Sequence, residues 1–135
     1  TRIKPNEQAG RVRVAYALAE ASSLAVGPIE MFNLPNGARI LSGELTHDAL
    51  GGSTTASVGH AAYKNAAGTV VALDVDEYKA AAASTGIATV GVAATSALGR
   101  NSVVDADSDG IPVTVVIAGA AATGTIELTM LYVVD

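Results

Sequence analysis

Three aspartates near the start of the last third of the chain have a spacing that could bind a metal ion. Asp105, Asp107 and Asp109 alternate with other residues and are followed by Gly110. This matches the opening of calcium-binding loops, in which alternating carboxylates converge on a hard cation and glycine allows a sharp turn. The match is incomplete, because the twelfth position of such a loop carries a bidentate glutamate and here is Val116. Two interpretations therefore stay open, a Ca²⁺ site and a solvated acidic turn.

The residues that an enzyme would need show no comparable pattern. The chain has no cysteine, and its two histidines, His47 and His60, have no metal-site spacing between them or with Asp48. No serine lies in a Gly-x-Ser-x-Gly elbow, and the glycines form no nucleotide-binding fingerprint. We interpret the histidines as ordinary surface or turn residues, and we predict a protein without catalytic residues or an organic cofactor.

The basic residues are unevenly distributed. Four of the eight, Arg2, Lys4, Arg11 and Arg13, lie in the first thirteen positions of a chain whose net charge is −5. The other four are widely separated, which argues against a nucleic-acid surface because phosphate binding needs a folded basic patch. We predict that the N-terminal four bind a partner with an acidic surface; the alternative is a solubilising tail.

Alternation of side chains with a period of two indicates that the chain is mainly β-strand. In residues 11–19, Val12, Val14, Tyr16 and Leu18 lie on one face and arginines and alanines on the other, which predicts a half-buried strand. The same reasoning predicts further strands over residues 29–34, 39–46, 54–60, 69–73, 87–94, 111–117 and 125–134, the last two forming an antiparallel hairpin.

One segment is expected to be helical. Residues 74–84 begin with Asp74 as a candidate N-cap and Glu77 as its capping-box partner, and an alanine-rich tract follows. Seven or eight short strands with one short α-helix favour an antiparallel two-sheet β-sandwich of jelly-roll type. We expect the sandwich over residues 11–135, preceded by an extended N-terminal arm at residues 1–10.

The composition suggests that the domain works as part of an assembly. Half of the residues are apolar but only 4% are aromatic, so the core must be built mainly from Ala, Val, Leu and Ile. Small side chains bury little area each, and such a domain gains stability by burying more surface against neighbours. No apolar run is long enough to span a membrane, and residues 1–5 lack the apolar segment of a secretory signal, so we expect a soluble chain made in the cytoplasm.

Several short motifs resemble small structural proteins of tailed bacteriophages. The run Glu-Met-Phe-Asn-Leu-Pro-Asn-Gly-Ala-Arg-Ile-Leu-Ser-Gly at residues 30–43 resembles their Leu-Pro-x-Gly-Ala-Arg-Val stretch. Residues 53–60 are similar to an alternating strand of that family, residues 77–82 to its Tyr-x-Ala-Ala-Ala helix, and residues 121–126 and 132–135 to its closing hairpin. The matches are short but extend over residues 11–135.

This resemblance implies a capsid decoration, or cement, protein. Such proteins are small β-sandwiches, often homotrimers, that bind the major capsid protein on the outer capsid surface of the virion and stabilise its lattice. It follows that Arg2, Lys4, Arg11 and Arg13 would face the capsid, and that the 105–110 loop would lie at the rim. Neither a nucleic acid nor a membrane is expected as a partner.

Two other functions remain open at this point. A head fibre base, a tail subunit or a baseplate subunit would also fit a sandwich of this size. A host-glycan binding module would need exposed aromatic side chains, and the whole chain has only five: Tyr16, Phe32, Tyr63, Tyr78 and Tyr132.

Overall fold

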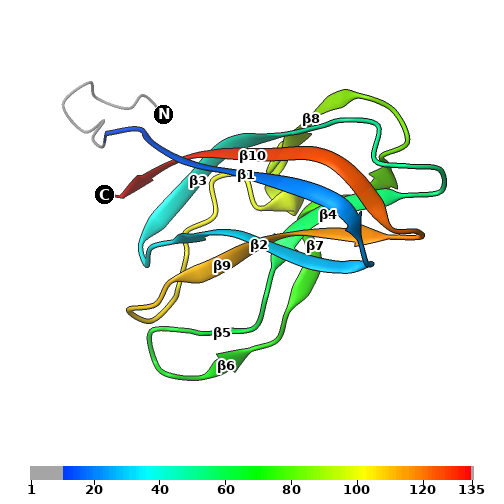
Figure 1. Ribbon diagram of the computed structural model, residues 1–135. Helices are drawn as coiled ribbons and strands as arrows, with labels where there is room; N and C mark the ends of the chain where they lie inside the picture. Colours follow the sequence, from blue (N-terminus) through cyan, green and yellow to red (C-terminus); the bar gives the residue numbers. More distant parts are fainter. Residues whose placement is uncertain (1–10, 135) are drawn as a thin grey trace.

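Two four-stranded antiparallel sheets pack face to face in the computed structural model, which describes residues 11–134 (Figure 1). Sheet A has the order β1 (Arg13–Leu24), β10 (Ala122–Val134), β3 (Ala38–His47) and β8 (Ala88–Val92). Sheet B has the order β2 (Gly27–Leu34), β9 (Ile111–Ala118), β4 (Thr55–His60) and β7 (Asp74–Ala83). The predicted antiparallel two-sheet sandwich is therefore confirmed.

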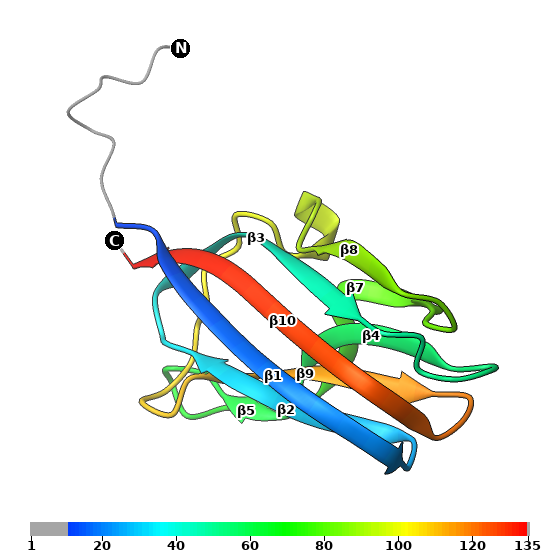
Figure 2. The ribbon, with the colours of Figure 1, turned by 45° about the horizontal axis from the view of Figure 1, so that its top comes forward.

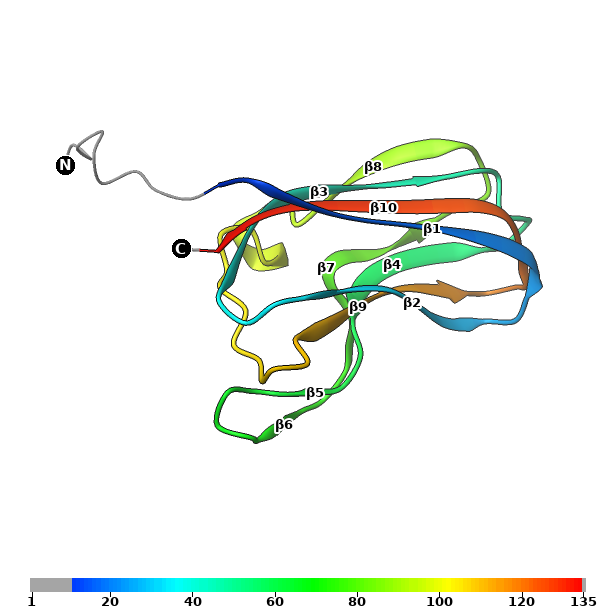
Figure 3. The same ribbon diagram turned by 60° about the vertical axis from the view of Figure 1, so that its left-hand side comes forward.

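The chain changes sheet at almost every connection. Figure 3 shows the two layers edge on, and consecutive long strands lie in opposite layers except for β4 and β7, which pair with each other. A small two-stranded hairpin, β5 (Tyr63–Lys64) and β6 (Val70–Val71), projects from the β4–β7 connection. The only helical segment in residues 11–134 is a 3-10 turn at Ser96–Leu98, and no helix there is long and apolar enough to cross a membrane.

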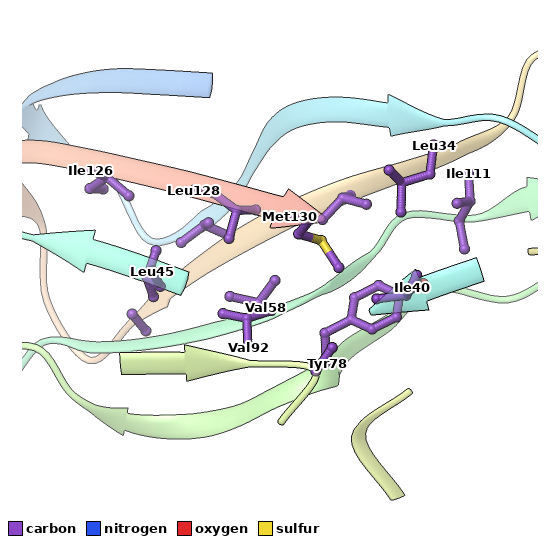
Figure 4. Packing of buried hydrophobic residues seen from close by; sticks show 14 of the residues in the cluster. Leu34, Ile40, Leu45, Val58, Tyr78, Val92, Ile111, Ile126, Leu128 and Met130 are labelled. Atoms are coloured by element: carbon purple, nitrogen blue, oxygen red, sulfur yellow. The ribbon is translucent and has the colours of Figure 1, made fainter. Parts of the chain in front are cut away.

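The core lies between the two sheets and consists mainly of aliphatic side chains. From sheet A, β10 contributes Ile126, Leu128 and Met130, and β3 contributes Ile40 and Leu45, all fully buried (Figure 4). Sheet B supplies a facing layer from its central strands. Its fully buried members are Val58, Val113, Val115 and Ile117. Tyr78 is the one buried aromatic residue, as expected for a core poor in large side chains.

β1 confirms the predicted strand, but the face that it buries is the one with small side chains. Ala15, Ala17 and Ala19 are half-buried and Ala21 is buried, whereas Tyr16 and the other large apolar residues of the strand are exposed. Alternation places one set inward and the other outward, and from Val14 to Ala19 both sets are apolar. The period alone therefore does not show which face lies against the core.

The predicted α-helix at residues 74–84 is wrong, because Asp74–Ala83 forms strand β7. Ala82 and Ala83 pair with Ala56 and Thr55 of β4, so the open edge of that strand takes up the alanine tract despite its helix propensity. The Asp74 carboxylate accepts a hydrogen bond from the backbone N–H of Asp76 at 3.2 Å, which is a turn contact and not a helix cap.

The predicted hairpin of the last two long strands is also wrong. β9 and β10 are consecutive, but β9 lies in sheet B between β2 and β4, and β10 lies in sheet A between β1 and β3. The connection at residues 119–121 crosses from one layer to the other. Gly119 is essential there: its φ is +87°, and a Cβ atom at this position would overlap the carbonyl oxygen of Ser53.

Candidate functional site

The structure places two of the four N-terminal basic residues at one end of sheet A. Arg11 precedes β1 and Arg13 begins it opposite Tyr132, and both arginines are exposed. Arg2 and Lys4 lie outside the described residues, as does the whole predicted arm. Figure 2 shows that this end of β1 lies beside the C-terminal end of β10. Of the four residues predicted to bind a partner, the structure therefore describes Arg11 and Arg13, and both are exposed at one end of the sandwich.

The 105–110 loop is held by its own hydrogen bonds and by the β5–β6 hairpin. The Asp107 carboxylate accepts a bond from the N–H of Asp109 at 3.0 Å, and the Asp105 carboxylate accepts one from the N–H of Ala66 at 3.1 Å. The Asp107 N–H donates to the Lys64 carbonyl at 2.9 Å. No three acidic, histidine or cysteine side chains in residues 11–134 form a group that could hold a metal ion. The structure thus does not bring the three aspartates together as one ligand set.

An open hollow of about 340 Å³ lies between this loop and the hairpin. The residues that line it include one cation and two carboxylates as well as apolar groups, namely Asn33, Ala62, Tyr63, Lys64, Val70, Asp107, Asp109, Gly110 and Pro112. The Asn33 amide donates to the Asp109 carbonyl at 2.9 Å and ties the loop to β2. The hollow is therefore a notch at one end of sheet B, and this hydrogen bond fixes the loop that forms one of its walls.

The two histidines lie apart, at the ends of strands in different sheets. His47 ends β3 in sheet A and His60 ends β4 in sheet B. Their exposed fractions are only 4% and 6%, so the interpretation as surface residues is wrong. Each ring uses Nδ1 in a hydrogen bond to the next residue's carbonyl, at 2.8 Å for His47 and 3.0 Å for His60. Both act as packed residues that close strand ends.

Acidic side chains gather near His60 at the start of β7. Burial is the main cause that raises the pKa of the Glu77 carboxyl, and a hydrogen bond to Asp74 and that residue's negative charge raise it further. The pKa of Asp74 is lowered, mainly because its carboxylate accepts a hydrogen bond from the backbone N–H of Asp76. A carboxyl whose pKa is raised on folding destabilises the folded state when it ionises.

This gives a pH-dependent prediction for Glu77→Gln. Protonated Glu77 favours the folded state. This contribution is fully present below the ordinary pKa of 4.5 and is lost as the carboxyl ionises, when pH rises through the higher pKa of the folded state. Gln mimics the protonated acid, so the variant should melt at a higher temperature than wild type at neutral pH. The difference should shrink as pH falls toward 4.5. Thermal melts across this pH range measure the effect, and a difference independent of pH would contradict it.

Lys79 is a second titratable group that the sequence did not mark as special. It lies in β7 with only 9% of its surface exposed, and its ammonium donates to the carbonyls of Ala80 at 3.0 Å and Ala56 at 3.3 Å. Burial lowers its pKa. The hydrogen bond to Ala56 joins β7 to β4, and the bond to Ala80 is within β7, so this buried cation has a structural role.

The largest feature that the sequence analysis missed is the exposed apolar side of β1. Val14, Tyr16 and Leu18 are each about half exposed and form a row on the outside of sheet A, and Val12, which is 55% exposed, lies just before the strand. A soluble domain seldom leaves such a row uncovered. The signal was present in residues 14–19, where the side chains on both faces of the strand are apolar although a sandwich buries only one of them.

Comparison with known proteins connects this fold to phage capsids. No protein-family model matches the chain, and no curated protein has a significantly similar sequence. Among solved structures, a chain of the capsid of Ralstonia phage GP4 is 25% identical with a TM-score of 0.67, over 99% of this chain and 92% of that one. A chain of the cyanophage Pam1 capsid asymmetric unit is 19% identical with a TM-score of 0.68, over 100% and 94%.

A third capsid shows the same fold at a greater distance. A chain of the acid-stable capsid of Helicobacter pylori bacteriophage KHP30 is 15% identical with a TM-score of 0.55, over 90% of this chain and 86% of that one. In all three cases the likeness extends over nearly the whole chain. The resemblance to structural proteins of phage particles, inferred from short motifs, is therefore confirmed.

Proposed function

We propose that this protein is a structural component of a phage capsid that decorates the outer surface and stabilises the lattice of the major capsid protein. The observation that carries the proposal is the full-length likeness to a chain of the GP4 phage capsid. The exposed apolar row on β1 supports it, since an assembled subunit needs surfaces that neighbours cover. No catalytic step is part of this function.

The strand order supports a finer description of the fold as a jelly roll. If the eight long strands are numbered in chain order, sheet A reads 1-8-3-6 and sheet B reads 2-7-4-5. This order results when the chain folds as paired Greek keys into two sheets. We assign the jelly-roll topology on this basis, with residues 11–135 as the domain and residues 1–10 as its N-terminal arm.

The N-terminal end of the domain is the side that we assign to the capsid. Arg11 and Arg13 are exposed at one pole, and Arg2 and Lys4 extend the basic run into the arm. A basic segment on an otherwise acidic chain fits an acidic surface on the lattice protein. Three copies joined as a homotrimer would bring twelve such residues to one junction of the lattice and would resist its opening.

Removal of residues 1–10 should therefore weaken binding to the shell and leave the sandwich folded. The reason is that the arm carries two of the four basic residues, whereas the core between the two sheets is built from residues within 11–134. The measurement is occupancy on purified particles, determined by co-sedimentation and by density in electron micrographs, with circular dichroism as the check on folding. Full occupancy by the truncated chain would contradict the capsid-facing role of the arm.

The acidic loop and the alternative sites on the particle need separate tests. Because the Asp105, Asp107 and Asp109 carboxylates do not converge in this structure, a Ca²⁺ site there requires the loop to rearrange around the ion, and thermal melts with added calcium and with a chelator test this. A head fibre base, tail or baseplate position is distinguished by where the chain lies on an intact particle.

Among the five aromatic residues only Tyr16 is exposed, so no stacking platform for a glycan is present in residues 11–134.

A further inference from the structure

The outer face of sheet A carries an apolar ridge along one border. Val14, Tyr16 and Leu18 alternate along β1 and point away from the core alanines of that strand, and we call these three side chains the β1 ridge. Because β1 is an edge strand of sheet A, the ridge follows the border of the face (Figure 2). Figure 3 shows that no other element of residues 11–134 lies over this side of the sheet. The face is therefore open to contact.

A hollow of about 260 Å³ lies on the same face, on the far side of β10 from the ridge. The residues that line it are Ser42, Gly43, Glu44, Thr129 and Leu131. Ser42 pairs with Leu131 and Glu44 with Thr129, so these four side chains form the rim of the hollow. Gly43 leaves the floor without a side chain, because a Cβ atom there would point toward the core and meet Met130. The hollow is thus a hole between two neighbouring strands.

The strand pairings place the ridge and the hollow at the same height along the sheet. Tyr16 pairs with Thr129 and Thr129 pairs with Glu44, so one row across three strands leads from the ridge to the hollow. The next row consists of Val14, Leu131 and Ser42. One face therefore carries a projecting surface and a receiving surface side by side, in the same two rows.

We propose that a second copy of this chain covers this face, so that two copies pack sheet A against sheet A with the β1 ridge of each in the hollow of the other. The two-fold axis runs along β10. An axis parallel to the strands keeps the position along each strand and exchanges the two borders of the face, so β1 of one copy lies over β3 of the other. A two-fold contact must be self-complementary, and the ridge and hollow in register meet that requirement.

The side chains that meet in this pair suit each other. Tyr16 has an apolar ring for the hollow, and its hydroxyl can donate a hydrogen bond to the exposed Glu44 carboxylate of the other copy. Val14 and Leu18 cover the rim on either side of the ring. The ridge residues are now 61%, 54% and 48% exposed, and the pair removes much of this apolar surface from water.

The axis also keeps both copies pointing the same way. Arg11 and Arg13 lie at the N-terminal end of β1, so the two basic ends of a pair lie at one pole and can face one surface together. This agrees with the proposed function, but the pair does not depend on it, because the ridge and the hollow belong to the chain itself.

The first test changes the ridge and the hollow separately in the full chain. Tyr16→Glu places a second carboxylate beside Glu44 of the other copy, and Ser42→Arg fills the hollow without touching the ridge. The matched control is Leu73→Glu, since Leu73 is 60% exposed just before β7 of sheet B. Sedimentation equilibrium should give Tyr16→Glu and Ser42→Arg half the mass of wild type and of Leu73→Glu, whether or not copies also associate through another surface. Circular dichroism should be unchanged in all four.

Glu127 opposes the pair and gives it a specific signature. It lies opposite Leu18 on β10, one row beyond the hollow, so an axis along β10 brings the Glu127 carboxylates of the two copies toward each other. Glu127→Gln removes this repulsion and should lower the dissociation constant of the pair a few-fold. A dissociation constant that rises instead would contradict an axis along β10.

A cross-linking experiment tests which residues meet. The chain has no cysteine, so Tyr16→Cys and Glu44→Cys each introduce a single thiol. Packed sheets lie about 10 Å apart, which is farther than a disulfide reaches, so a short bismaleimide is the cross-linker. It should link the two variants when they are mixed and leave each variant alone largely as single chains on a denaturing gel.

Two further outcomes would overturn the inference: wild type with the same mass as Tyr16→Glu, or folded Ser42→Arg with the mass of wild type. Strong cross-linking of Tyr16→Cys alone would do so as well, because it would place ridge against ridge. Binding to purified capsids is measured separately. A chain that pairs but binds no capsid contradicts only the proposed function, and a chain that binds capsids without pairing contradicts only this inference.

Discussion

Gly59→Ala should destabilise the protein by about 3 kcal/mol or detach β7 from the sandwich. Gly59 lies in β4 where β7 crosses closest to it, and a Cβ atom there would overlap the carbonyl oxygen of Asp74 and stand 2.8 Å from that of Val75. Both are backbone atoms, and the Ser57 hydroxyl holds the Val75 carbonyl in place with a 2.8 Å hydrogen bond. The strand therefore has no flexible group that could make room.

Urea unfolding at one protein concentration measures this effect, because self-association would raise the apparent stability at higher concentration. Gly86→Ala is the matched control: its Cβ would have no atom within 4 Å, so it should change the free energy of unfolding by less than about 1 kcal/mol. If Gly59→Ala were as stable as wild type, the close approach of β7 to β4 would be wrong.

Leu128→Ala should lower the free energy of unfolding by about 2–5 kcal/mol. Leu128 is fully buried in β10, between Ala17 of β1 and Leu45 of β3, and its side chain points into the core (Figure 4). Removal of three heavy atoms leaves a cavity that small neighbours cannot fill without moving the strands. Because the core has few large residues, the loss of one of them removes a large fraction of the total free energy of unfolding.

The control for this substitution is Leu73→Ala. Leu73 is 60% exposed, just before β7, and its truncation should change the free energy of unfolding by no more than about 0.5 kcal/mol. The same urea measurement serves both variants. Equal stabilities of Leu128→Ala and Leu73→Ala would contradict the position of the core between the sheets.

The packing of β1 gives a physical reason why a domain with few large core residues would gain stability from contact with other chains. The strand places alanines against the core and larger apolar side chains outside, so the monomer buries the smaller part of the apolar surface that β1 offers. Burial of the rest, at about 25 cal/mol per Å², becomes available only when another chain covers it. The alanines of β1 therefore stabilise the single domain, whereas its exposed Val14, Tyr16 and Leu18 contribute only when another chain covers them.

The sequence by itself determined the features that depend on local pattern. The local pattern identified every long strand of the sandwich except β7, because a strand that presents one face to a single core tends to alternate with a period of two. The sequence also showed directly that basic residues, Arg11 and Arg13 among them, are concentrated near the N-terminus, and that few aromatic residues are available for the core.

Only the tertiary structure decided which face, which sheet and which partner each segment takes. The alanine tract of β7 is a strand because β4 offers an open edge, and β9 and β10 lie in different sheets because their connection crosses the sandwich. The outward direction of Tyr16 follows from contacts with β10 and the core that are distant in sequence. Such long-range pairings outweigh local propensities of a few tenths of a kcal/mol per residue, and no local pattern records them.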